Sequence, residues 1–400
     1  KTLFIIIIEL ICILYSLIFQ KCLNVDNTKE LKQIPKNGNE VFSPFSLSAA
    51  LLLLMMGSNG TTKNEIRRSM FKNEIPSDID ENYKMLSDEL AFRTRNEVRL
   101  CVANKLFGQK DIKIVESFTA NALKFYGSEL QPLDFVNNPE PSREIINQWI
   151  AEKTDNVIHD MLPPKALNQD TVMVLVNAIY FKGNWSFQFN PNDTEMETFY
   201  VSESTQKKVA MMQDEEHIAL AGYNPQLQCK VLNLPYKGEE MSMIFILPDR
   251  IDGLVDLENK LTPYVFRQLL ASVKNQTTSI SIPTFKIKSS FDLIPVLSKM
   301  GISEIFDEHA ANLSAMVHPP PNLYVSYARQ DAVVDVYEEG SEAAAATNIV
   351  FKKTAISFNF IFTANHPFFI LEAYNIIIYF IINCLCIRTK KNYLEFKFSD

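Results

Sequence analysis

Several patterns that mark enzymes and metal-binding proteins are missing from this chain of 400 residues. The 11 glycines are scattered, and none of them forms a phosphate-binding loop. No Gly-x-Ser-x-Gly segment is present, which excludes the nucleophile turn of the α/β-hydrolases. The 5 histidines form no His-Glu-x-x-His pair or other zinc-binding spacing. We therefore expect no enzymatic activity of the chain's own, no metal and no cofactor.

Cysteine is scarce, and the charge is of moderate size. The 6 cysteines do not have the spacing of a disulfide framework, so we expect buried or incidental thiols. The net charge of -8 disfavours nucleic acid and anionic membranes as partners. A hydrophobic fraction of 47% with 22% charged residues is typical of a globular protein.

An apolar run over residues 3–19 follows Lys1 and ends near Gln20, Lys21 and Cys22. This pattern indicates a secretory signal peptide over residues 1–22, although Glu9 interrupts the run and the expected cleavage site lacks small residues. Secretion would place the protein outside the cell and make it a glycoprotein. Glycosylation sequons occur at Asn59, Asn184, Asn192, Asn275 and Asn312.

The segment over residues 337–355 changes character abruptly. Its central part consists of small residues between an acidic start and a β-branched, aromatic end, with two lysines near its close. Four alanines after a serine favour a capped helix. The alternative is a loop whose small side chains can enter a β-sheet without clashing. The central residues are Glu338, Glu339, Gly340, Ser341, Glu342, Ala343, Ala344, Ala345, Ala346 and Thr347.

This central pattern resembles the hinge and reactive loop of the serpins, a family of serine protease inhibitors. Three further segments support the resemblance: Asn-Ala-Ile-Tyr-Phe-Lys-Gly-Asn-Trp over residues 177–185, Ile-Asn-Gln-Trp-Ile over 146–150, and Ala-Asn-His-Pro-Phe over 364–368. A fourth is Phe-Ser-Pro-Phe-Ser over residues 42–46. In serpins the serines of the fourth segment lie under the main sheet and control whether it can open, and the asparagine of the first segment belongs to the same network. Carried over, these control residues are Ser43, Pro44, Ser46 and Asn177, and Trp185 would lie near the top of the sheet, where the loop first enters.

The resemblance implies an α+β fold: one domain over residues 23–375, with three β-sheets, eight or nine α-helices and an exposed reactive loop over about 338–358. The residues themselves predict several of the elements. An apolar stripe predicts a helix over residues 142–162 with Ser142 as its cap. A continuous apolar run over 171–176 predicts a strand buried on both faces, and alternation predicts a strand over 279–287.

The C-terminal segment over residues 376–400 departs from the serpin pattern, because no Phe-x-Gly-Arg ending follows. Three interpretations remain open. Residues 376–382 could form the last buried strand, or the apolar run from Phe368 with the basic residues behind it could anchor the chain in a membrane, which Glu372 disfavours. The third interpretation is that residues after about Asn375 are translated non-coding sequence.

As a serpin-like chain, the protein is expected to be a monomer that inhibits a serine protease as an irreversible suicide substrate. Small residues at the alternate hinge positions favour inhibition, because each must become buried when the loop inserts. The register implied by the resemblance places the attacked bond at Thr354–Ala355, which suits an elastase-like enzyme. The bond Lys353–Thr354 would suit a trypsin-like enzyme, and attack after Lys352 remains an alternative. A non-inhibitory carrier, chaperone or storage serpin, or a defective product, are the other hypotheses.

Overall fold

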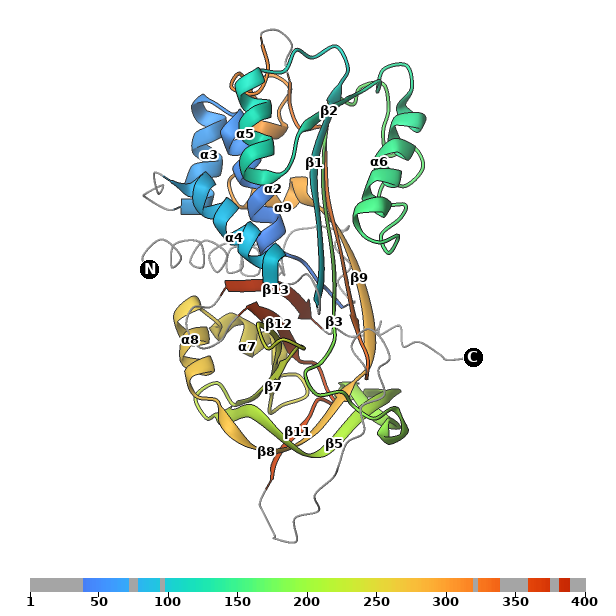
Figure 1. Ribbon diagram of the computed structural model, residues 1–400, viewed down its shortest axis with the longest axis vertical. Helices are drawn as coiled ribbons and strands as arrows, with labels where there is room; N and C mark the ends of the chain where they lie inside the picture. Colours follow the sequence, from blue (N-terminus) through green and yellow to red (C-terminus); the bar gives the residue numbers. More distant parts are fainter. Residues whose placement is uncertain are drawn as a thin grey trace.

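The fold is taken from a computed structural model that describes residues 39–71, 78–93, 98–318, 323–338, 359–374 and 381–388. Two β-sheets and eight α-helices form this part of the chain. The five-stranded sheet and most of the helices occupy one half of the molecule, and the second sheet occupies the other half (Figure 1). The predicted α+β class is confirmed.

A five-stranded sheet lies in the middle of the first half. Its strand order is β2-β1-β3-β10-β9. The two central strands, β3 and β10, run parallel to each other, whereas each pairs antiparallel with its other neighbour. The strands are β1 (Val98–Gln109), β2 (Leu130–Leu133), β3 (Met173–Gly183), β9 (Phe285–Asp292) and β10 (Tyr327–Val336).

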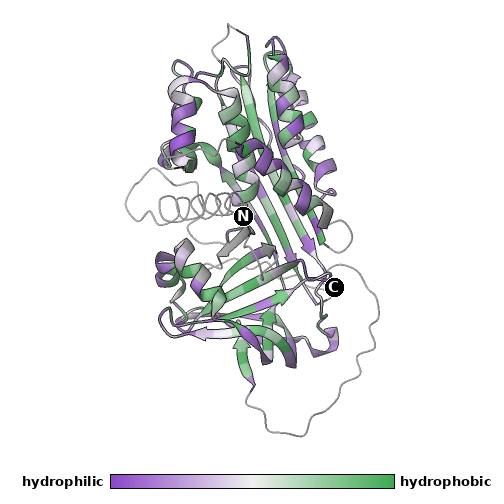
Figure 2. Ribbon diagram, turned by 60° about the vertical axis from the view of Figure 1, so that its left-hand side comes forward, coloured by the Kyte–Doolittle hydropathy of each residue, from purple (hydrophilic) through white to green (hydrophobic). Residues whose placement is uncertain are grey.

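Strand β3 is buried on both faces, as the apolar run predicted, although it begins at Met173 rather than at residue 171. Its side chains alternate between two hydrophobic cores. Leu175 and Ile179 enter the larger core, while Val176 and Ala178 enter a smaller one. Figure 2 shows the same concentration of hydrophobic residues along the strands.

Helices cover both faces of this sheet (Figure 1). Helix α6 covers the face of the smaller core, to which Ile146 and Ile150 contribute. The other helices of this half lie against the opposite face, with α2 in contact with β1 and β3. They are α2 (Pro44–Gly57), α3 (Gly60–Phe71), α4 (Ile79–Arg93), α5 (Glu116–Tyr126) and α9 (Leu293–Lys299), with α6 (Pro139–Lys153) on the smaller-core face.

The second sheet has the order β11-β8-β5-β6-β7-β12-β13, with β4 paired to β5. Its strands are β4 (Glu195–Ser202), β5 (Thr205–Asn224), β6 (Cys229–Pro235), β7 (Met241–Pro248), β8 (Lys274–Pro283), β11 (Phe360–Thr363), β12 (Phe369–Tyr374) and β13 (Ile381–Arg388). Helices α7 (Leu254–Lys260) and α8 (Pro263–Ala271) lie beside it in Figure 1. Strands β5 and β8 pair on both sides of a register shift between Asp214 and His217. The strands of this half therefore form one sheet, where a serpin is expected to have two smaller ones.

The helix predicted over residues 142–162 is α6, but its bounds differ from the prediction. The helix begins at Pro139 after the cap residue Asn138, and Ser142 lies buried within it. Proline suits this first position because its missing N–H has no partner there in any helix. The helix ends at Lys153, and Asp155 and Asn156 then take left-handed backbone angles that no helix can continue.

The strand predicted over residues 279–287 is divided between β8 and β9, which belong to different sheets. At the other end of the chain, β13 pairs antiparallel with β12. It begins at Ile381, close to the end of the strand that was considered over residues 376–382. Residues 375–380 lie outside the described part of the chain.

Candidate functional site

Three predicted control residues meet where α2 begins beneath the central strands. Ser43 is the N-cap of α2, and its hydroxyl accepts a hydrogen bond from the backbone N–H of Ser46 at 3.1 Å. Pro44 is the first residue of the helix, where its fixed φ suits the helical turn. Asn177 lies in β3 on the side facing the larger core, and the side chains of Ser43, Ser46 and Asn177 are fully buried.

Two residues that were not predicted as site residues, Asn104 and Gln330, complete a buried hydrogen-bond network. Asn104 in β1 accepts hydrogen bonds from the Ser46 hydroxyl at 2.9 Å and from Asn177 Nδ2 at 2.5 Å. Gln330 in β10 donates from Nε2 to Asn177 Oδ1 at 2.5 Å and to the Ser43 carbonyl at 3.2 Å. The Ser43 N–H donates to Gln330 Oε1 at 3.3 Å. The network therefore joins α2, β1, β3 and β10.

The network stabilises the closed arrangement of the sheet. A buried polar group that loses its partner costs about 1–3 kcal/mol. Gln330 lies on β10 and Asn177 on β3, so separating these strands breaks the hydrogen bond between them. Each side chain that stays buried then has a polar group without a partner, which costs free energy. Asn104 lies opposite Asn177 in the register of β1 and β3, which the sequence alone does not reveal, because β1 carries other polar residues such as Arg99 and Lys105.

Trp185 lies just beyond the end of β3 and links the two halves of the molecule. Its Nε1 donates a hydrogen bond to the carbonyl of Tyr337 at 2.9 Å, directly after β10. Its ring stacks on Tyr236, with a centroid distance of 4.8 Å and an interplanar angle of 7°. A Cβ atom added at Gly183 would lie 2.6 Å from the Tyr236 ring, so this close packing requires glycine there.

Tyr236 in turn donates a hydrogen bond from its hydroxyl to Glu372 Oε1 at 2.8 Å. Glu372 lies in β12 and is fully buried, and its Oε2 has no hydrogen-bond partner among the described residues. Burial raises the pKa of Glu372 well above its ordinary value, and the hydrogen bond from Tyr236 offsets only part of this shift. A chain of contacts thus runs from a buried carboxyl group to the end of β10.

Glu338, the first hinge residue, is the last described residue before the reactive loop. Its carbonyl accepts a hydrogen bond from the Phe189 N–H at 3.0 Å, and its Oε1 accepts one from the Thr194 hydroxyl at 2.7 Å. The remaining predicted hinge residues, 339–347, lie outside the described residues, as do Lys352, Lys353, Thr354 and Ala355. Residues 1–22 also lie outside them.

The described residues contain no group of three or more His, Cys, Asp or Glu side chains placed to hold a metal ion. Within the same ranges, no helix is both long and apolar enough to cross a membrane. Asp331, which follows Gln330 in β10, is buried beside Arg329 at 3.1 Å and accepts a hydrogen bond from the Ser290 hydroxyl, so its charge is compensated within the sheet.

Comparison with known proteins agrees with this geometry. Residues 21–381 match the family model described as serpin (serine protease inhibitor). The chain is 33% identical to a leukocyte elastase inhibitor of Xenopus tropicalis, over 88% of this chain and 93% of the relative. It is 36% identical to serpin B6 of Macaca fascicularis, over 88% of this chain and 92% of the relative. It is also 36% identical to antithrombin-III of Ovis aries, over 84% of this chain and 73% of the relative.

Solved structures share the fold. The crystal structure of uncleaved ovalbumin aligns with a TM-score of 0.81 at 23% identity, covering 95% of this chain and 98% of that one. Serpin48 of the insect Tenebrio molitor aligns with a TM-score of 0.79 at 28% identity, covering 96% and 97%. The family model that matches residues 21–381 and the relatives at 33% and 36% identity show that the chain belongs to the serpin family.

Proposed function

We propose that this serpin inhibits serine proteases as an irreversible suicide substrate. The observation that carries the proposal is the parallel pairing of β3 and β10 at the centre of the five-stranded sheet, with the reactive loop directly after β10. Parallel pairs are slightly less stable per residue than antiparallel pairs. A chain that turns back after β10 and enters between the two strands replaces one parallel pairing with two antiparallel ones.

The side chains at this junction suit such an opening. Gln330 and Asn177 hold the closed state across the gap, and Trp185 and Phe189 hold the backbone of residues 337 and 338 where insertion would begin. An inserted strand alternates its side chains between the two faces of the sheet. The small hinge residues Ser341, Ala343, Ala345 and Thr347 meet that requirement.

In the proposed reaction, the hydroxyl of the protease serine attacks the carbonyl carbon of the scissile bond. The amine of the following residue leaves, and an acyl-enzyme forms. The freed loop then inserts between β3 and β10 and carries the attached protease with it, before water can hydrolyse the ester. The energy comes from an intact state that is held kinetically.

We assign the attacked bond to Thr354–Ala355, with Lys353–Thr354 as the alternative. Threonine suits an elastase-like protease and lysine a trypsin-like one. The names of two relatives support an elastase-like target, since the Xenopus tropicalis and Rattus norvegicus proteins are leukocyte elastase inhibitors.

The test is to mix the folded protein with trypsin, chymotrypsin and elastase and to separate the products on denaturing gels. We expect a covalent band at the summed mass with one enzyme, and mass spectrometry of the released C-terminal peptide identifies the bond. Cleavage of folded protein within residues 338–358 without a stable complex would contradict inhibition and favour a non-inhibitory serpin.

We also propose that the protein is secreted and glycosylated. The apolar run over residues 3–19 supports this, and the sequon asparagines Asn59, Asn192 and Asn275 lie exposed on the described surface. Expression in cultured animal cells should release the protein into the medium with a mass that falls after enzymatic removal of N-glycans. Retention inside the cells at the unmodified mass would contradict both parts.

A further inference from the structure

Two strongly exposed isoleucines lie near each other on the outer face of the second sheet. Ile218 in β5 is 70% exposed, the highest value for a large apolar side chain among the described residues, and Ile361 in β11 is 59% exposed. Ile218 lies opposite Thr277 of β8, and Ile361 lies opposite Ser279 of the same strand. The strand order β11-β8-β5 therefore places the isoleucines on either side of β8, roughly 12 Å apart by strand spacing and rise. These four residues form the isoleucine patch.

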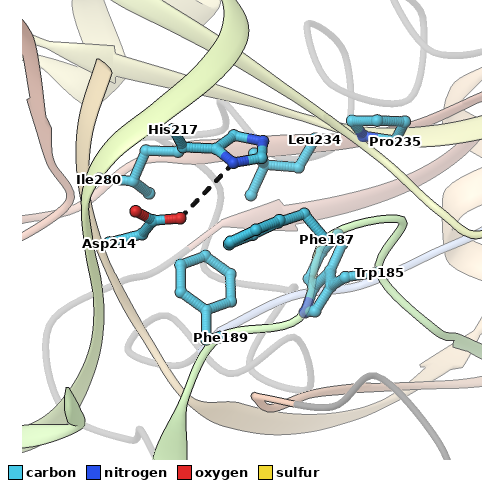
Figure 3. A pocket seen from close by; sticks show the side chains of 8 residues that line it. All are labelled: Trp185, Phe187, Phe189, Asp214, His217, Leu234, Pro235 and Ile280. Atoms are coloured by element: carbon cyan, nitrogen blue, oxygen red, sulfur yellow. Dashed lines mark ion pairs between the residues drawn. The ribbon is translucent and has the colours of Figure 1, made fainter. Parts of the chain in front are cut away.

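The inner face of the same strands is covered. His217, directly before Ile218, points into a small hollow beside Phe187, with 4.4 Å between the two ring centroids (Figure 3). Phe362, directly after Ile361, is fully buried. Since successive side chains of a strand point to opposite faces, both isoleucines point away from the core. Their exposure is therefore a property of the paired strands.

Hydrogen bonds to the backbone fix the patch in place. Lys230 Nζ donates to the Ile361 carbonyl at 2.9 Å, which holds β11. Asn359 Nδ2 donates to the Glu215 carbonyl at 3.1 Å, which joins the residue before β11 to the part of β5 just before Ile218. A surface that is already ordered loses little conformational freedom when a partner binds to it.

The patch lies close to the proposed reactive bond along the chain. Ile361 follows Ala355 by six residues, and six residues span at most about 22 Å. Strands β5, β8 and β11 lie together at the lower end of the molecule in Figure 1. A protease–inhibitor interface of ordinary size involves about 20–30 residues on each side. The few loop residues around one bond cannot supply that number, so a protease bound there must also contact the body of the inhibitor.

We propose that the isoleucine patch is a second docking surface for the protease that binds the reactive loop. This inference rests on the proposed function, because it requires a protease at the loop. The matching surface of the protease would carry apolar side chains over Ile218 and Ile361. Glu215 and Glu216 are exposed just before Ile218, so basic side chains at the rim of that surface would be favoured. The patch would then select among proteases that share one preference for the cleaved residue.

The experiment uses the intact protein from cultured animal cells and the protease that forms the covalent band, and it measures the second-order rate constant of complex formation. Ile218→Thr and Ile361→Thr each remove apolar surface but keep the β-branched shape that strands favour. We expect the rate constant to fall about threefold in each single variant and about tenfold in the double variant. The stoichiometry of inhibition and the unfolding temperature should stay unchanged, because loop insertion is not affected.

The matched control is Ile145→Thr, the same change at a side chain that is 45% exposed on α6, in the other half of the molecule. It should leave the rate constant unchanged. If no covalent complex forms, so that the proposed function itself fails, elastase and trypsin with the catalytic serine replaced by alanine still report docking. Their dissociation constant should then rise about tenfold in the double variant. Equal constants for the wild type and the folded double variant would overturn the docking surface and leave inhibition untouched.

Two other occupants of the patch are distinguished with the same proteins. Asn275, two residues from Thr277 on the same face of β8, is a sequon asparagine, and a glycan there would cover part of the patch. A rate difference that appears only after enzymatic removal of N-glycans would assign the patch to carbohydrate. Self-association of the wild type that Ile218→Thr and Ile361→Thr abolish, measured by size-exclusion chromatography, would assign it to a second copy of the chain. Either result would overturn the proposal.

Discussion

Gln330 donates hydrogen bonds to both Asn177 and the Ser43 backbone, so its removal should weaken the closed sheet more than any surface change. Substitution Gln330→Ala leaves Asn177 Oδ1 and the Ser43 N–H without these partners inside the protein. We expect the free energy of unfolding to fall by about 1–3 kcal/mol, measured as a lower unfolding temperature by circular dichroism.

The control for this prediction is Gln148→Ala. Gln148 lies exposed on α6 and donates a hydrogen bond to Glu152 one turn away. Loss of such a surface contact should change stability by less than about 0.5 kcal/mol. Equal losses in the two variants would show that the network across β3 and β10 does not hold the sheet closed.

Glu372 should make stability depend on pH. Because burial raises its pKa in the folded state, the folded protein retains a proton that the unfolded chain releases above its own lower pKa. Stability contributed at this position is therefore greatest at acidic pH, and it falls as the pH rises from the unfolded pKa through the folded one. The loss can reach about 1.4 kcal/mol per pH unit within that window.

Substitution Glu372→Gln removes this titration but retains an acceptor for the Tyr236 hydroxyl. We expect the variant to unfold at a higher temperature than the wild type at pH 8, with the difference shrinking towards pH 5. Thermal unfolding followed by tryptophan fluorescence is a suitable measurement, since Trp185, one of the two tryptophans, stacks on Tyr236. A difference between the two proteins that stays constant with pH would contradict the buried-carboxyl account.

At the scale of elements, the decisive contact is that between β3 and β10. Ile179 and Ala332 lie directly opposite each other in this parallel pair. A disulfide formed by Ile179→Cys together with Ala332→Cys would tie the strands and prevent insertion. We expect the oxidised variant to be cleaved by the target protease without a stable complex, and reduction to restore the covalent band.

The controls for this prediction are the two variants that carry only Ile179→Cys or only Ala332→Cys. Each should form the complex under both oxidising and reducing conditions, because neither can join the strands. A stable complex from the fully oxidised double variant, with the disulfide verified by mass spectrometry, would show that the loop does not enter between β3 and β10.

Elements with strong local patterns could be predicted from the sequence, and those decided by distant contacts could not. The buried strand β3 and the stripe of α6 were identified, because apolar periodicity depends on neighbouring residues alone. The predicted start of α6 was wrong, since the helix begins at Pro139, whose fixed φ suits the first helical position, and Ser142 lies within the helix. The division of residues 279–287 between two sheets likewise follows from tertiary pairing.

The same limit applied to the site. Ser43, Ser46, Asn177 and Trp185 were identified by resemblance, and the described structure brings the first three together while placing Trp185 beside Tyr337. Asn104 and Gln330 were missed as members of the network, because their partners lie far away in the sequence and only the register of the sheet brings them close. Glu372 was read as an interruption of an apolar run, and its partner Tyr236 is 136 residues away.

At the scale of the whole molecule, the proposed mechanism requires an intact form that is not the most stable arrangement of the chain. One hydrogen-bonded network holds a parallel strand pair that the loop following β10 is proposed to separate. Insertion of the loop between β3 and β10 would replace this parallel pairing with two antiparallel ones and bury the small hinge residues in the sheet. Both changes should lower the free energy of the molecule.

The measurement that tests this claim most directly compares the unfolding temperatures of the intact protein and of protein cleaved once within residues 338–358, with the cleavage position mapped by mass spectrometry. We predict that cleavage raises the unfolding temperature by more than about 10 °C, because the freed loop adds a strand to the central sheet. An unchanged or lower unfolding temperature after this single cleavage would contradict the insertion of the loop between β3 and β10.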